Sequence, residues 1–164
     1  MEIRIAGLIR ESYVDGEGIR YAIFMQGCLR RCAGCHNPET HALDGGRLID
    51  TAEIISEIKK NPLLDGITLT GGEPFLQIDS ADEIARAVKN FGLSVWCYTG
   101  FIFEDLPPEA APLLKNIDVL IDGAFIESQR DLELQFRGSR NQRIIDLNKT
   151  REQNRIVLWT ENGG

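Results

Sequence analysis

The chain alternates between two patterns of hydrophobic and polar positions. Short apolar runs, which lie next to Gly, Asp or Ser, indicate strands, because extended segments of four to eight residues suffice to cross a buried sheet. Four such runs stand out, at residues 19–25, 66–70, 94–98 and 118–122. The first of them leads directly into a group of cysteines.

Between these runs, apolar residues recur at helical spacing. The stretch "DTAEIISEIKKN" predicts a helix with Asp50 or Thr51 as its N-cap. The stretch "DSADEIARAVKNFG" predicts a second helix, capped by Asp79 or Ser80 and ending near Gly92. A weaker helical segment, "PPEAAPLLKN", carries Pro near its start.

Alternating strands and helices predict an α/β fold with a parallel sheet and helical crossovers. In such folds, sites are built from the loops that follow the carboxyl ends of the strands. The 164 residues fit a single domain spanning 1–164, and we see no repeat or linker that would divide it. The motifs described below each follow a predicted strand.

Composition and charge narrow the class of ligand. Hydrophobic residues make up 43% of the chain and charged residues 26%, as in ordinary globular proteins. A net charge of −7 argues against binding nucleic acid through its phosphates. We see no apolar run of about 20 residues that would span a membrane. The opening "MEIRIAGLIR" does not resemble a signal peptide, so we expect a cytoplasmic protein whose thiols stay reduced.

Three of the four cysteines lie within eight residues, as C-x-x-x-C-x-x-C: Cys28, Cys32 and Cys35. A structural zinc site needs four ligands, usually in two separated pairs. The remaining Cys97 lies within a predicted strand, where it is expected to be a core residue. Three thiolates on a [4Fe–4S] cluster would leave one iron open to another ligand. We therefore predict such a cluster, against the alternative of three incidental thiols.

This spacing is the signature of the radical S-adenosylmethionine superfamily, which the stretch closely resembles. The resemblance implies that S-adenosylmethionine binds the open iron through its amino and carboxylate groups and is cleaved reductively to a 5′-deoxyadenosyl radical. The superfamily holds the methionine amino group with a glycine-rich acidic turn after the next strand. Here "TLTGGEPFLQ" provides Gly71, Gly72 and Glu73 at that place. Glycine permits close backbone approach, and a carboxylate complements an ammonium.

Two longer stretches narrow the resemblance. "YVDGEGIRYAIFMQGCLRRCAGCHNPET" is similar to the opening of glycyl-radical-enzyme activases. "LIDGAFIESQRDLELQFRGSRNQRIIDL" resembles the family that activates anaerobic ribonucleoside-triphosphate reductase. The resemblance runs from about residue 3 to 147 and implies a partial, open (β/α) barrel of about six units. It implies a glycyl radical made on the reductase large subunit, with flavodoxin or ferredoxin as electron donor.

The resemblance also suggests further cofactor contacts, each with an alternative. Gly34 stands where the superfamily often has an aromatic residue near adenine, so an adenine contact there must use the backbone beside Cys35 or shift to His36. His36 could equally be a structural residue of the cluster loop. Asp122 could face the active site or cap a turn. The tail segment 156–159 could be a last strand or a docking segment.

The run "FRGSRNQR", residues 136–143, carries the resemblance to the reductase activators. Its arginine and amide side chains suit a carboxylate or a peptide backbone, although a solvated loop is the simpler interpretation. Asp15 and Arg20 could position the partner or cofactor, or serve in turns and salt bridges. Two other functions stay open: activation of another glycyl radical enzyme, of pyruvate formate-lyase type, and electron transfer by a non-catalytic iron–sulfur protein. The acidic turn with Glu73 argues against an electron-transfer protein, because such a protein needs no pocket for an amino-acid group.

Overall fold

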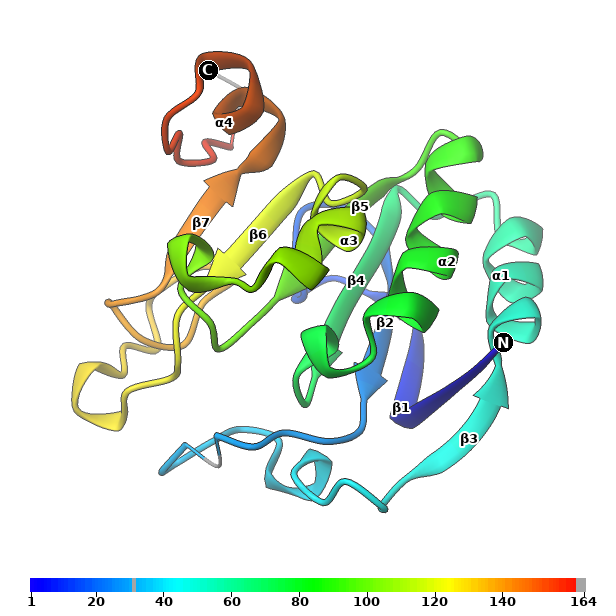
Figure 1. Cartoon of the computed structure of the whole chain (residues 1–164), viewed down its shortest axis with the longest axis horizontal. Helices are drawn as coiled ribbons and strands as arrows, with labels where there is room; N and C mark the ends of the chain where they lie inside the picture. The colour runs from blue at the N-terminus through cyan, green and yellow to red at the C-terminus, as the bar shows by residue number, and fades with distance from the viewer. Residues whose placement is uncertain (31, 162–164) are drawn as a thin grey trace.

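The computed structural model describes residues 1–30 and 32–161, and within these residues seven strands form one sheet (Figure 1). Their order in the sheet is β3-β1-β2-β4-β5-β6-β7. The central strands β2, β4, β5 and β6 are parallel, whereas β1, β3 and β7 pair antiparallel at the two sides. The strands are β1 Glu2–Ser12, β2 Arg20–Met25, β3 Arg47–Asp50, β4 Gly66–Gly71, β5 Ser94–Tyr98, β6 Val119–Asp122 and β7 Arg143–Asp146.

Three helices cover one face of this sheet: α1 (Thr51–Lys60), α2 (Ile78–Asn90) and α3 (Ala111–Leu114) (Figure 1). Each lies on the connection between two parallel strands. A fourth helix, α4 (Leu147–Gln153), follows β7 near the C-terminal end. In the described part of the chain, no helix is long and apolar enough to cross a membrane.

The α/β class and the open sheet are confirmed, and all four predicted strands form. The three crossovers between parallel strands are fewer than the roughly six units that the resemblance implied, because antiparallel strands complete both sides of the sheet. The antiparallel strands were not predicted. The weak helical segment is a 3-10 turn, Pro108–Ala110, followed by the single turn of α3.

The predicted caps were correct for one helix and wrong for the other. The Asp50 side chain accepts a hydrogen bond from the Ala52 N–H at 2.9 Å and caps α1. Helix α2 begins earlier than predicted, at Ile78, so neither Asp79 nor Ser80 is its N-cap. The Ser80 hydroxyl donates instead to the Glu2 carbonyl at 2.7 Å, because β1, which was not predicted, lies beside the helix.

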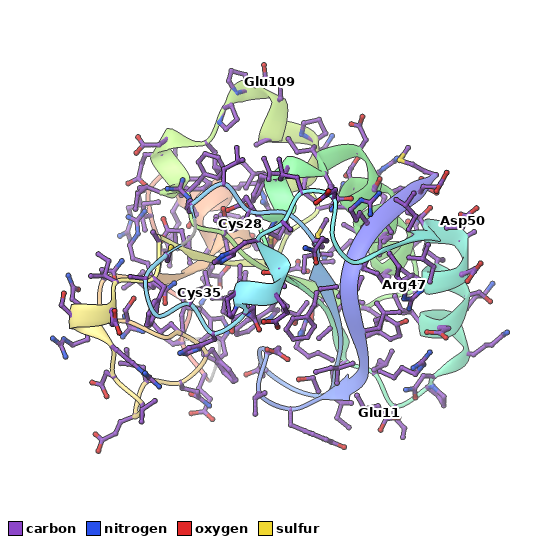
Figure 2. All side chains as sticks on the ribbon, turned by 90° about the horizontal axis from the view of Figure 1, so that it is seen from below. Glu11, Cys28, Cys35, Arg47, Asp50 and Glu109 are labelled. Atoms are coloured by element: carbon purple, nitrogen blue, oxygen red, sulfur yellow. The ribbon has the colours of Figure 1, made fainter. Side chains whose placement is uncertain are left out.

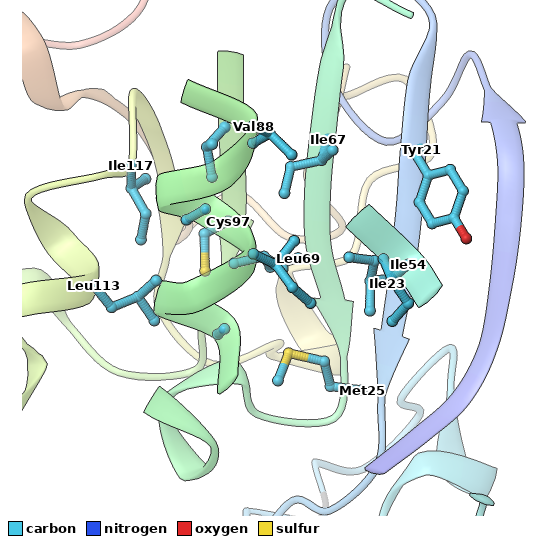
Figure 3. Packing of buried hydrophobic residues seen from close by; sticks show 14 of the residues in the cluster. Tyr21, Ile23, Met25, Ile54, Ile67, Leu69, Val88, Cys97, Leu113 and Ile117 are labelled. Atoms are coloured by element: carbon cyan, nitrogen blue, oxygen red, sulfur yellow. The ribbon is translucent and has the colours of Figure 1, made fainter. Parts of the chain in front are cut away.

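The main core lies between the helices and the sheet (Figure 3). Cys97 is fully buried there, beside Leu69 and Leu113, which confirms it as a core residue. The opposite face of the sheet carries a smaller apolar cluster of Trp96, Val119 and Ile121, against which residues such as Phe136 and Trp159 pack. Apolar residues are found in both clusters because successive side chains along β5 and β6 point to opposite faces of the sheet.

The tail segment 156–159 lies along β7. The Asp146 N–H donates to the Val157 carbonyl, and the Trp159 N–H donates to the Ile144 carbonyl, both at 2.9 Å. An antiparallel bridge joins Ile145 and Leu158. The segment therefore pairs with the edge of the sheet through one bridge, without forming a full last strand, and brings the Trp159 ring edge-on to Trp96.

Candidate metal and cofactor site

A cavity of about 510 Å³ opens where the parallel strands end. Its wall is built from the loops that follow β2, β4, β5 and β6, together with the loop before β7, part of β1 and the loop between β1 and β2. In Figure 1 these loops lie toward the lower edge of the view. Since carboxyl ends of parallel strands meet at one edge of a sheet, residues far apart in the chain converge here. The cavity contains most of the residues that the sequence indicated.

Cys28, Cys32 and Cys35 all line this cavity and are partly exposed. Figure 2 shows Cys28 and Cys35 on the same loop, which follows β2. The Cys28 N–H donates to the His41 carbonyl at 3.1 Å, and the Cys35 N–H donates to the Cys32 carbonyl at 3.1 Å. The Cys35 thiol accepts from the Asn37 N–H at 3.4 Å, but burial still raises the pKa of Cys35.

The arrangement of donors distinguishes a cluster from a single ion. Among residues 1–30 and 32–161, no three His, Cys, Asp or Glu side chains gather closely enough to hold one metal ion. A [4Fe–4S] cluster places each thiolate on a different iron, so its ligands need not converge on one point. Three thiols on one wall of a cavity therefore fit an iron–sulfur cluster, and thiolate is a ligand that such clusters prefer.

Glu73 lies at the cavity wall and is only 4% exposed. Its Oε1 accepts a hydrogen bond from the Gly100 N–H at 2.8 Å. Its Oε2 accepts from the Thr99 hydroxyl at 2.8 Å and from the Phe75 N–H at 3.1 Å. Burial raises the pKa of Glu73, while these three hydrogen bonds and the charge of Arg30 oppose the rise. A carboxylate has about four acceptor positions, so a further donor can still bind.

Gly71 and Gly72 hold the acidic turn against the cysteine loop. Gly71 has φ +90°, which favours glycine, and a Cβ on Gly72 would lie 2.3 Å from the Gly27 carbonyl oxygen. The Gly72 N–H donates to the Met25 carbonyl and the Glu73 N–H to the Gly27 carbonyl, both at 2.7 Å. The two glycines therefore allow the turn to lie directly beside the loop that carries the cysteines.

His36 and Gly34 differ in placement. His36 lines the cavity, and its ring centre lies 5.2 Å from that of Phe125. Gly34 is exposed and has φ +72°; a Cβ there would lie 2.9 Å from the Glu127 carboxyl carbon. Among the described residues that form the cavity wall, Gly34 is absent. The structure thus brings His36, the three cysteines and the acidic turn together, but leaves Gly34 outside them.

Asp122 and Arg20 make structural contacts. Asp122 is fully buried, accepts from the Phe103 N–H at 2.8 Å, and pairs with Arg143. Arg20 is 1% exposed and donates to the Thr68 hydroxyl at 2.9 Å and to three backbone carbonyls. Burial lowers the pKa of Arg20 to about 10. Both side chains hold loops around the sheet rather than facing the cavity.

Asp15 does line the cavity. The Ser12 hydroxyl donates to its carboxylate at 2.5 Å, and the Thr68 hydroxyl donates to its backbone carbonyl at 2.6 Å. The loop between β1 and β2 is thereby held against the wall formed by β4.

The loop at residues 136–143 is held by hydrogen bonds within itself and to the residues that follow β6, so it is not simply solvated. Oε1 of Gln142 accepts from the Gly138 N–H at 2.8 Å, while its amide nitrogen donates to the Gly123 carbonyl at 3.0 Å. The Asn141 amide donates to the Ala124 carbonyl at 2.8 Å. Arg137 lines the cavity, and its Nη1 donates to the Gln142 carbonyl at 2.6 Å.

Sequence reasoning missed several residues of the wall. Thr99 and Gly100, which contact Glu73, follow a predicted strand directly, and that position was the available signal. Arg30 lies between two of the cysteines, where the spacing motif leaves the residue type free. Phe125 follows the Asp-Gly at the end of β6 and could have been recognised only from that position.

Comparisons with known proteins give the family of the chain. Residues 14–145 match a family model described as a 4Fe-4S single cluster domain, which defines the chain as an iron–sulfur protein of that class. The anaerobic ribonucleoside-triphosphate reductase-activating protein of Haemophilus influenzae is 35% identical over 139 residues, covering 80% of this chain and 90% of that protein. The activating protein of Escherichia coli K12 is 31% identical over 143 residues, covering 82% and 92%. The chain belongs to the family of anaerobic ribonucleoside-triphosphate reductase-activating proteins.

Among solved structures, the chain is similar to QueE from Escherichia coli, with 18% sequence identity and a TM-score of 0.45. The match covers 61% of this chain and 53% of QueE, so the chain spans about half of that structure.

Proposed function

We propose that this protein activates anaerobic ribonucleoside-triphosphate reductase, using a [4Fe–4S] cluster and S-adenosylmethionine to generate a glycyl radical on the reductase large subunit. The observation that carries the proposal is that three clustered thiols and a buried carboxylate line one cavity, in a chain of the activating-protein family. When bound, the reduced cluster and S-adenosylmethionine supply a one-electron cleavage of the sulfonium and the removal of a hydrogen atom from glycine.

The chain's own residues bind and orient these groups. Cys28, Cys32 and Cys35 hold the cluster. Glu73 accepts a hydrogen bond from the methionine ammonium at the acceptor position that its protein donors leave over. Gly71 and Gly72 keep the acidic turn close to the cluster loop. The protein needs no general acid or base, since its task is orientation and exclusion of water.

The adenine contact is assigned to the part of the wall near Cys35. The rings of His36 and Phe125 line the cavity there, and a flat purine packs well against aromatic rings. Gly34 would take part only through its backbone. We further infer one domain over residues 1–164, a cytoplasmic location, and flavodoxin or ferredoxin as the electron donor.

The experiment is to incubate the anaerobically reconstituted protein with S-adenosylmethionine, a reductant and purified anaerobic reductase, and to record the glycyl doublet by electron paramagnetic resonance. A doublet on the reductase is expected. A doublet on a pyruvate formate-lyase type enzyme alone would favour that activase instead. A reducible cluster without any cleavage of S-adenosylmethionine would indicate an electron carrier and refute the proposal.

A further inference from the structure

We propose that Arg30 binds the carboxylate of the methionine part of S-adenosylmethionine, so that Arg30 and Glu73 recognise the two charged ends of one α-amino acid group. This inference rests on the proposed function. It assigns a specificity-determining role to a residue inside the cysteine motif, at a position that the motif itself leaves free.

The structure places the Arg30 side chain across the loop that follows β5. Its guanidinium carbon lies 4.6 Å from the centre of the Phe101 ring, as in a cation–π contact. A Cβ on Gly100 would lie 2.4 Å from the Arg30 Cδ, so a side chain there would displace Arg30 from this path. Arg30 also lines the cavity. The side chain therefore joins the cysteine loop to the loop after β5 at the cavity wall.

The Arg30 and Glu73 side chains both lie close to Gly100. The position of a Cβ on Gly100 is 2.5 Å from the Arg30 Nε and 3.5 Å from the Glu73 Oε1. Burial raises the pKa of Glu73, and the charge of Arg30 opposes that rise. A cation and an anion thus stand close together on one cavity wall. An α-amino acid carries the complementary pair, an ammonium and a carboxylate, on adjacent atoms.

The Arg30 guanidinium is also available to a ligand. Within the described part of the chain, it donates no hydrogen bond and forms no ion pair. It lies against the Phe101 ring. Arg137, which also lines the cavity, donates its Nη1 to the carbonyls of Arg140 and Gln142 and is committed to its own loop. A guanidinium has five N–H donors in a planar fork that matches a carboxylate.

The test compares S-adenosylmethionine with decarboxylated S-adenosylmethionine, which keeps the sulfonium and the amino group but lacks the carboxylate. Affinity of the anaerobically reconstituted protein for each is measured by isothermal titration calorimetry. Arg30→Ala should weaken binding of S-adenosylmethionine about 10- to 100-fold. It should change binding of the decarboxylated compound by less than about twofold. Arg30→Lys should recover part of the loss, because it keeps the charge without the fork.

The matched control is Arg86→Ala, which removes one exposed arginine from α2, where it pairs with Asp82. Both affinities should stay unchanged, and iron content should be equal in all variants. If Arg30→Ala lowers the affinity for both ligands equally, or for neither, Arg30 does not bind the carboxylate and the inference is overturned. If the unsubstituted protein binds neither ligand, the proposed function itself fails, and this inference fails with it.

Discussion

The backbone N–H of Gly100 donates a hydrogen bond to Oε1 of Glu73 at 2.8 Å, and this contact joins the loops after β4 and β5. The Thr99 hydroxyl donates to the other carboxylate oxygen, also at 2.8 Å. Glu73 therefore has two tasks, since it holds two loops together and presents negative charge to the cavity. The two tasks respond differently to substitution and to pH.

The first prediction concerns pH and stability. Burial raises the folded-state pKa of Glu73 above its usual value near 4.5, so the folded state binds more protons than the unfolded state in this range. The contribution of Glu73 to the free energy of unfolding therefore falls as pH rises from about 4.5 through the folded pKa. Glu73→Gln removes this dependence. The difference in free energy of unfolding should shift in favour of the variant as pH rises; a constant difference would contradict the prediction.

The second prediction concerns the cofactor. Glu73→Ala should keep the cluster, as judged by iron content, but weaken binding of S-adenosylmethionine by about 1.5–3 kcal/mol, because an ammonium loses its charged partner. Thr99→Val is the matched control, since it removes one support of the carboxylate and leaves the charge in place. It should cost less than Glu73→Ala in isothermal titration. Unchanged affinity in Glu73→Ala would remove Glu73 from the cofactor site.

The third prediction concerns the metal. Replacing Cys28, Cys32 or Cys35 with Ala should abolish assembly of an air-sensitive cluster, measured by iron analysis and visible absorbance after anaerobic reconstitution. Cys97→Ala is the control. It should keep the iron and lose about 0.5–1.5 kcal/mol of stability, as for a small deletion in a packed core. Stoichiometric zinc without iron in the unsubstituted protein would disprove the cluster.

The fourth prediction concerns the ion pair between Arg143 and Asp122, the last residue of β6. Arg143 donates from Nη2 to the fully buried Asp122 at 2.5 Å and to the exposed Glu104 at 2.6 Å. Arg143→Met leaves a buried carboxylate without its cation and should cost about 3–5 kcal/mol in chemical denaturation. Glu104→Gln removes only the exposed partner and should cost less than about 1 kcal/mol. Equal losses in the two variants would show that burial of Asp122 is not the cause.

The fifth prediction concerns the choice of partner. The sequence of residues 136–143 resembles the reductase activators, so we expect this loop, rather than the cysteine and acidic-turn motifs, to choose the partner. The Arg140 side chain is exposed, whereas Arg137 and Gln142 are bonded within the loop. Arg140→Ala should keep uncoupled cleavage of S-adenosylmethionine with a strong reductant but lower the glycyl radical yield on the reductase. A parallel fall of both activities and of cofactor affinity would place the loop in the cofactor pocket.

Much of the site was readable from local spacing. Cys28, Cys32 and Cys35 lie on one loop, so eight residues of chain suffice to bring them to the same cavity. The acidic turn follows β4, which pairs directly with β2, so neighbouring strands place Glu73 beside the cysteine loop. For Gly34 the local position was less informative. Its place next to Cys35 predicted a backbone contact with the cofactor, which stays a prediction, while the structure places Gly34 beside the Glu127 side chain and outside the described cavity wall.

The amino-acid sequence by itself determined the central parallel strands, the helices between them, the cysteine motif and the acidic turn, because each depends on residues close together in the chain. Tertiary structure alone decided which strands complete the sheet and which donors contact Glu73. The pairing of β1 with β2 and β3, and of β7 with β6, depends on contacts between distant segments. The contacts of Gly100 with Glu73 and of Arg30 with Phe101 likewise join loops that are adjacent only in the folded chain. Local patterns cannot encode such contacts, since hydrogen bonds and packing between distant segments form only when the whole sheet brings the loops together.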